Sequence, residues 1–173
     1  ELSPDRTAYV ARLRRGVLFH DGTELTADDV VYTFKSFLDP AFRGRSAAYR
    51  QQLANVTAID RYTVEFRLKG TFASFPINLV MGIVRARSGT TNARQPIGTG
   101  PYRVVRFVTD DRLVLSAFDR YYSGRPRNDS VVLKVIRDDT MRGLELRNRT
   151  IDLVVNDLSP DIVWQLREGG RYG

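Results

Sequence analysis

The stretch Tyr62–Leu68, which reads YTVEFRL, constrains the fold more than any other part of the sequence. Apolar side chains occupy every second position, and polar side chains fill the positions between them. This period of two predicts a strand with one buried face and one exposed face. The pair Asp60-Arg61 before it predicts a turn, and residues 56–59 supply the first strand of a hairpin.

A helix is predicted in the stretch of residues 16–34, which reads GVLFHDGTELTADDVVYTF. Thr26 is its expected N-cap, and Asp29 stands three residues later, at the spacing of a capping box. Pro40 is expected to end the helix. The apolar residues form one helical face, and they are Val30, Val31, Phe34, Phe37 and Leu38.

The rest of the chain mixes the same two kinds of element. Further strands are predicted at residues 102–108, 112–118, 130–136 and 151–155. The last of these follows a helix that ends near Asn148, so it is expected to be a parallel crossover strand. Ser159-Pro160 predicts the start of a final helix, with Trp164 in the core. The pattern predicts an α/β (mixed α+β) fold with a mixed sheet.

Composition removes several function classes. The 173 residues include no cysteine, so disulfide scaffolds, cysteine-ligated zinc and thiol nucleophiles are excluded. No apolar run approaches the roughly 20 residues of a membrane helix, and the first residues carry no leader-like stretch. The net charge is +7, but the arginines are scattered along the chain, which favours a solvated basic surface.

Four groups of residues resemble sites of chemistry, and each has a structural alternative. His20-Asp21 could be a base with its orienting acid, yet its position at an Asp-Gly turn favours a structural role. Asp28-Asp29 point about 100° apart on a helix, so capping is favoured over metal binding. The sequence GTGPY (98–102) lacks the helix that follows a phosphate loop. Tyr121-Tyr122 could stack bases, but an aromatic pair covering a sheet edge is favoured. Physical reasoning thus reaches a binding protein without a catalytic constellation.

Four stretches, in this order, resemble the family 5 extracellular solute-binding proteins, the peptide, dipeptide and nickel receptors of ABC importers. They are YVARLRRGVLFHDGTELTADDVVYTF, AIDRYTVEFRL, PIGTGPYRVVRF and VVLKVIRDDTMRGLELRNRTIDL. The resemblance implies a periplasmic-binding-protein-like fold, of the class with an extra subdomain. It places residues 1–90 in that extra subdomain and residues 91–173 in part of the main first lobe. The second lobe is expected to be absent, so the chain corresponds to an internal fragment.

The same resemblance implies a function and a small set of site residues. Tyr49 lies in the segment that corresponds to a family stretch whose aromatic residue lines the ligand pocket. Asn156 and Asp157 follow the segment that corresponds to a strand ending at the cleft. The family captures short peptides or similar small solutes between two lobes and delivers them to a membrane permease. An enzyme, a metal site and a cofactor are not expected, nor is a nucleic-acid partner. The location implied is periplasmic or extracellular, with membrane contact only through the permease or a lipid anchor.

Two other functions remain open. The same domain could be the ligand-sensing part of a transcription regulator, or the chain could be a basic nucleic-acid-binding module. The sequence also departs from the family pattern, because Thr150 replaces the usual Glu and Ser123 replaces a usual aromatic residue. These departures affect the prediction of the ligand rather than of the fold.

Overall fold

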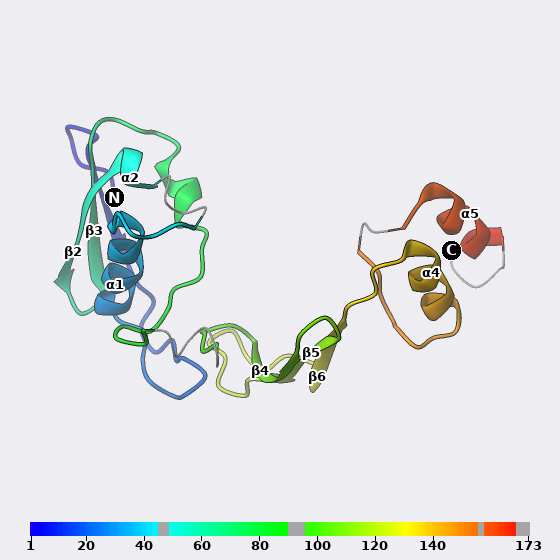
Figure 1. Ribbon diagram of the computed structural model, residues 1–173. Helices are drawn as coiled ribbons and strands as arrows, with labels where there is room; N and C mark the ends of the chain where they lie inside the picture. Colours follow the sequence, from blue (N-terminus) through cyan, green and yellow to red (C-terminus); the bar gives the residue numbers. More distant parts are fainter. Residues whose placement is uncertain (45–48, 90–95, 156–157, 169–173) are drawn as a thin grey trace. The chain divides into compact units, whose positions relative to one another are not determined.

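The computed structural model describes residues 1–44, 49–89, 96–155 and 158–168. Strands and helices are interspersed along the chain, as the mixed pattern of the sequence predicts (Figure 1). The chain divides into two compact units. The first comprises residues 1–105 and 115–131, and the second comprises residues 106–114 and 132–173.

An antiparallel sheet forms the basis of the first unit. Its strands are β1 (Ala8–Arg12), β2 (Leu53–Asp60) and β3 (Thr63–Leu68), in the order β1-β3-β2. The alternation predicted for β3 is confirmed, because Val64, Phe66 and Leu68 are buried while the residues between them are not. The predicted hairpin is β2–β3, with Val56 opposite Phe66.

Helix α1 (Ala27–Leu38) packs against β2 and β3 in the first unit. The predicted capping box is present: the backbone N–H of Thr26 donates to Asp29 Oδ2 over 2.8 Å, and the Thr26 hydroxyl donates to the same oxygen over 3.1 Å. Asp28 and Asp29 lie in the first turn, where carboxylates interact favourably with the helix dipole. The predicted N-terminus of the helix is therefore confirmed.

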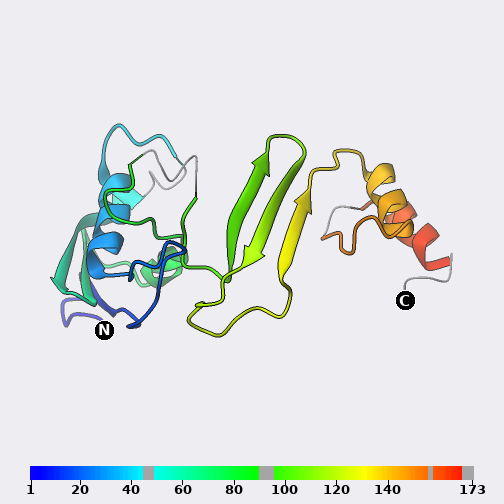
Figure 2. The ribbon, with the colours of Figure 1, turned by 90° about the horizontal axis from the view of Figure 1, so that it is seen from below.

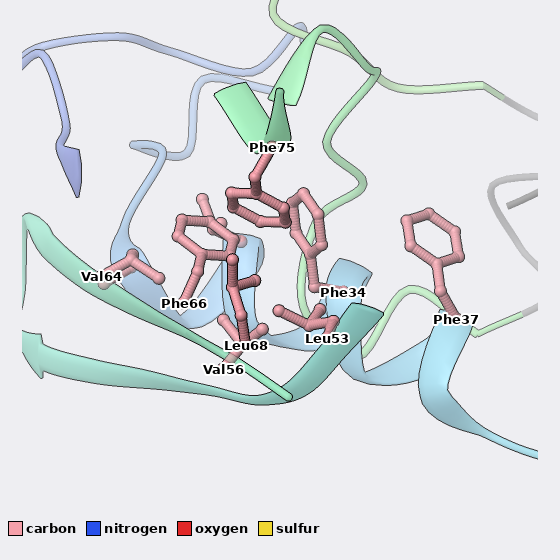
Figure 3. Packing of buried hydrophobic residues seen from close by; sticks show 10 residues of the cluster. Phe34, Phe37, Leu53, Val56, Val64, Phe66, Leu68 and Phe75 are labelled. Carbon is pink, nitrogen blue, oxygen red and sulfur yellow. The ribbon is translucent and has the colours of Figure 1, made fainter. Parts of the chain in front are cut away.

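The core of the first unit lies between this sheet and α1. Figure 3 shows the rings of Phe34, Phe66 and Phe75 turned toward one another, with centroids 4.9 Å apart for Phe34 and Phe66 and 5.6 Å apart for Phe66 and Phe75. Phe75 opens the short 3-10 helix η2 (Phe75–Leu79), directly after Ser74. Burial of each such side chain stabilises the fold by about 1.5–3 kcal/mol.

A second three-stranded sheet contains β4 (Tyr102–Val108), β5 (Arg112–Ala117) and β6 (Ser130–Lys134), in the order β4-β5-β6. These strands run side by side in Figure 2, coloured from green to yellow. The predicted hairpin between β4 and β5 is confirmed, and it turns at Asp110, whose φ is 59°.

Two helices follow in the second unit, α4 (Asp139–Arg147) and α5 (Pro160–Glu168), and they pack against each other. Both were expected, but two other predictions for this region were wrong. Residues 151–155 form no strand, and Trp164 is 61% exposed rather than in the core. A strand needs a neighbouring backbone to complete its hydrogen bonds, and the described part of this unit offers none beside residues 151–155. All of the buried hydrophobic side chains among the described residues belong to the first unit.

Candidate functional site

Tyr49 lies at the start of α2 (Tyr49–Gln52), a single turn that precedes β2. Its half-buried ring stacks on Phe37, with centroids 5.7 Å apart and planes 23° apart. The edge of Phe34 contacts it at 6.0 Å with an interplanar angle of 74°. Two core rings therefore hold the Tyr49 ring in a fixed orientation at the border of the core. The other two predicted site residues, Asn156 and Asp157, lie outside the described residues.

His20 is fully engaged with main chain. Its ring Nδ1 accepts a hydrogen bond from the backbone N–H of Gly98 over 3.2 Å, and Nε2 lies 3.1 Å from the carbonyl oxygen of Gly100. The backbone N–H of His20 donates to the Gly98 carbonyl over 2.9 Å. The ring also meets Phe118 edge-on, with centroids 5.2 Å apart. Since both ring nitrogens bind backbone groups, the ring serves to hold the segment of residues 98–100, and the structural interpretation of His20 is confirmed.

The GTGPY segment is thus a backbone partner of His20. Its glycines present N–H and C=O groups to the imidazole, and β4 begins at Tyr102 directly after it. A strand, not a helix, follows the glycines, so this segment lacks the helix N-terminus that holds a phosphate. The sequence predicted the role of each segment separately. It could not predict that the two segments contact each other, because about 80 residues separate His20 from Gly98 and Gly100.

The buried acid of α1 has two tasks. Asp29, which is 5% exposed, uses Oδ2 for the capping box and accepts the backbone N–H of Ala86 on Oδ1 over 2.7 Å. One turn later, the Thr33 hydroxyl accepts the Val84 N–H over 3.1 Å and lies 3.2 Å from the Val84 carbonyl oxygen. Helix α1 therefore fastens the segment of residues 83–89, here called the strap, by its main chain.

Asp21 contributes a side-chain contact to the same fastening. Its Oδ2 pairs with Arg85 of the strap over 2.8 Å, and its Oδ1 accepts the N–H and hydroxyl of Thr23. Partial burial raises the pKa of Asp21, but the Thr23 hydrogen bonds and the Arg85 charge outweigh burial and leave the pKa below its ordinary value. The carboxylate is held ionised for structure and is not poised to exchange protons.

Glu24, three residues after Asp21, joins the chain near Gly16 to the turn between β2 and β3. It accepts the backbone N–H of Gly16 over 3.0 Å and pairs with Arg61 over 2.9 Å. The Tyr62 hydroxyl donates to the same carboxylate over 3.0 Å. These contacts, led by the Gly16 N–H, lower the pKa of Glu24. Gly16 itself has a φ of 72°, a conformation that glycine adopts without strain.

The tyrosine pair Tyr121-Tyr122 lies at the turn after β5. The two ring centroids are 4.5 Å apart, and the Arg14 guanidinium lies 4.9 Å from the centre of the Tyr122 ring. Tyr122 is 44% exposed. The nearby Arg125 is paired with Asp119 and Asp129, so its charge is already balanced.

Within residues 1–44, 49–89, 96–155 and 158–168, no three His, Cys, Asp or Glu side chains gather closely enough to hold a metal ion. In the same ranges, none of the helices has both the length and the apolar character needed to span a membrane. The polar side chains described above mostly form hydrogen bonds with backbone groups and so stabilise the fold. The remaining candidate for ligand contact among them is the oriented aromatic ring of Tyr49.

Comparison with known proteins gives a consistent result. The sequence model described as bacterial extracellular solute-binding proteins, family 5 Middle, matches residues 1–172. The oligopeptide-binding protein AppA of Bacillus subtilis (strain 168) is 34% identical over 144 residues, which cover 76% of this chain and 26% of AppA. Heme-binding protein A of Haemophilus influenzae is 30% identical over 184 residues, which cover 90% of this chain and 34% of that protein.

Solved structures agree with the sequence matches. The chain superposes on the periplasmic binding protein DppA from Helicobacter pylori, solved with the peptide STSA, with a TM-score of 0.85 and 25% identity. The match covers 97% of this chain and 38% of DppA. The chain spans about a quarter to a third of the length of the two sequence relatives described above.

Proposed function

The chain belongs to family 5 of the bacterial extracellular solute-binding proteins, and on that premise we propose that it is part of the substrate-binding component of an ABC importer. This component captures short peptides, or a similar small solute, and delivers them to a membrane permease. The family consists of transport receptors rather than enzymes. The observation that carries the proposal is the match of the family model to residues 1–172. The names of AppA and DppA favour a peptide, whereas the name of heme-binding protein A keeps other solutes in view.

The receptor works by capture. Two lobes hinge shut over the solute, and the difference in affinity between the closed and open states drives closure. In this scheme residues 1–90 form the extra subdomain of the first lobe, and residues 91–173 form part of its main body. The second lobe is contributed by chain outside residues 1–173.

The exposed apolar side chains of the second unit support the proposal that this unit belongs to a larger lobe. A complete domain rarely exposes so many large hydrophobic side chains to solvent. Those of the second unit that are at least 43% exposed are Phe107, Val132, Leu133, Val135, Met141, Leu144, Leu153, Val155 and Trp164. We attribute this exposure to surfaces that the rest of the first lobe covers in the whole receptor.

Three residues are proposed to contact the solute: Tyr49, Asn156 and Asp157. Tyr49 suits this role because Phe34 and Phe37 fix its ring, so little side-chain entropy is lost when a ligand packs on it. Asn156 and Asp157 supply an amide and a carboxylate, groups that can bind the polar backbone of a peptide. The receptor is placed in the periplasm or at the outer cell surface, with a lipid anchor as one means of attachment.

Calorimetry with a pool of short peptides tests the proposal. The whole receptor that contains residues 1–173 is expected to release binding heat, and Tyr49→Ala is expected to weaken affinity about tenfold, while Tyr49→Phe keeps most of it. Tyr122→Ala, at an exposed tyrosine outside the candidate site, serves as the matched control. The isolated chain is expected to bind no peptide at micromolar concentration, because half of the cleft lies outside it. Micromolar binding by the isolated chain, or a receptor that ignores all short peptides, would contradict the proposal.

A further inference from the structure

We propose that His20 is a proton-sensitive latch on the loop of residues 98–100. Its neutral ring holds this loop, and the uptake of a second proton releases it. The proposal stands on the contacts of His20 and is independent of which solute the receptor binds.

The hydrogen-bond partners determine where the ring proton must be. A backbone N–H can only donate, so Nδ1, which faces the Gly98 N–H over 3.2 Å, carries no proton. A carbonyl oxygen can only accept, so Nε2, which lies 3.1 Å from the Gly100 oxygen, carries one. These two contacts are satisfied together only by the neutral tautomer with its proton on Nε2.

A second proton would have to bind at Nδ1, where it would point at the Gly98 N–H. Two donors would then face each other, and the hydrogen bond from Gly98 would be lost. The bond from Nε2 to Gly100 could remain, but the ring can no longer hold both ends of the loop. The neutral ring therefore binds both Gly98 and Gly100, whereas the charged ring binds Gly100 alone.

The surroundings offer the added charge no ready carboxylate among the described residues. On the loop that carries His20, Asp21 is paired with Arg85 of the strap. On the turn after β5, Asp119 is paired with Arg125. The remaining charge on that turn is Arg120, a cation 5.9 Å from the centre of the Phe118 ring, which itself contacts His20. An imidazolium formed here would thus lose a hydrogen bond without gaining an unpaired acidic partner.

Release of the latch is expected to be local. The backbone N–H of His20 still donates to the Gly98 carbonyl, and the Phe118 N–H still donates to the Pro101 carbonyl over 2.8 Å. Neither bond depends on the charge of the ring. The loop of residues 98–100 should loosen while the surrounding strands stay folded.

Nuclear magnetic resonance can test the latch directly, because His20 is the single histidine of the chain. At pH 8, nitrogen shifts of the labelled imidazole should report the Nε2–H tautomer. The pH is then lowered in steps toward 5, and the same nitrogen shifts show in which samples the ring carries a second proton. In the samples with a doubly protonated ring, the protection factor of the Gly98 amide against hydrogen exchange should be about tenfold lower, the loss expected for one hydrogen bond. The use of protection factors removes the intrinsic pH dependence of exchange.

Two variants separate the latch from general acid loosening. His20→Asn keeps an acceptor near the position of Nδ1 but cannot titrate, so Gly98 protection should stay constant with pH. His20→Ala should show low protection at both pH values, and Asp21→Asn, which removes a neighbouring carboxylate, should leave the pH response of Gly98 in place. Four results would each overturn the proposal: the Nδ1–H tautomer at pH 8, a ring that stays neutral until the fold itself is lost, unchanged Gly98 protection in the doubly protonated ring, or an equal response in His20→Asn.

Discussion

Gly143 of α4 lies directly beneath the side chain of Ile162 of α5. A Cβ atom added to Gly143 would come within 2.5 Å of Ile162 Cγ2, closer than carbon atoms can approach. Gly143 is also the buried residue of α4. The two helices therefore approach each other this closely because one of them has no side chain at the contact.

Gly143→Ala is expected to loosen the packing of α5 on α4 by about 1–3 kcal/mol, the usual cost of overpacking. In an open helix the same change would stabilise by about 1 kcal/mol, so the sign of the effect is informative. Hydrogen exchange of the α4 and α5 amides measures it. In an Ile162→Ala background the added methyl group has room, and Gly143→Ala should there be neutral or stabilising. A double-mutant cycle that shows no coupling would contradict the contact.

Arg149→Gly is expected to stabilise α4 by about 0.5–1 kcal/mol. Arg149 has a φ of 60°, and the Thr150 N–H donates to the Glu145 carbonyl while the Arg149 N–H donates to the Leu146 carbonyl. These two bonds form a Schellman motif, in which glycine fits the left-handed residue without steric cost. Amide exchange in α4 checks the gain. Arg147→Gly, at the last residue of the helix, is the matched control and should instead destabilise it, by up to about 0.5–1 kcal/mol, because the residue there is helical.

Acid should weaken the turn of residues 3–7 through Asp5. Hydrogen bonds from the Ser3 hydroxyl, and then from the Thr7 hydroxyl and N–H, lower the pKa of Asp5 from 3.8 to about 2. A lowered pKa means that the ionised form stabilises the fold above the unfolded pKa, and that this contribution disappears as the pH falls from about 4 to about 2. Carbonyl chemical shifts of Asp5 should give its midpoint. Ser3→Ala removes the strongest donor and should move that midpoint upward; an unmoved midpoint would argue against the hydrogen-bond cause.

The fluorescence of Trp164 should report how the second unit is covered. Trp164 is the single tryptophan of the chain and is 61% exposed. In the chain of residues 1–173 its emission should be that of a water-exposed indole, readily quenched by iodide. In the whole receptor the proposal predicts emission at shorter wavelength and weaker quenching. Equal quenching in both proteins would show that the missing parts of the first lobe do not reach α5.

Local patterns predicted local structure well in this chain. The capping residues Thr26 and Asp29 determine where α1 begins, because they act within one turn of helix. The alternation of β3 was equally readable, since the core lies on one side of it. His20 was correctly interpreted as structural from its place at a turn. Its partners Gly98 and Gly100 could not be predicted, because contacts with main chain leave no pattern in the side chains.

The predictions that failed depend on neighbours that the described residues do not supply. Residues 151–155 are apolar enough for a strand, but a strand exists only beside another one. Trp164 has a large apolar side chain that is typical of a core, but the described residues of its unit contain no buried hydrophobic side chains for it to pack against. The candidate site is divided in the same way: the structure gives Tyr49 an orientation, whereas Asn156 and Asp157 remain predictions from the resemblance.

The strap of residues 83–89 has a consequence for how such chains diverge. Asp29 and Thr33 bind it at Ala86 and Val84 through peptide groups, and the Tyr32 hydroxyl accepts the Gly89 N–H over 3.2 Å. Peptide groups are the same whatever side chains they carry, so mutations can accumulate in the strap while its path is kept. The segment should therefore look unrelated in distant homologues that still fold it in the same way. For the same reason much of it is a tolerant place to rewrite the sequence by engineering, provided that Asp29, Thr33 and the Asp21–Arg85 pair are left intact and Ile83 keeps an apolar side chain against the core.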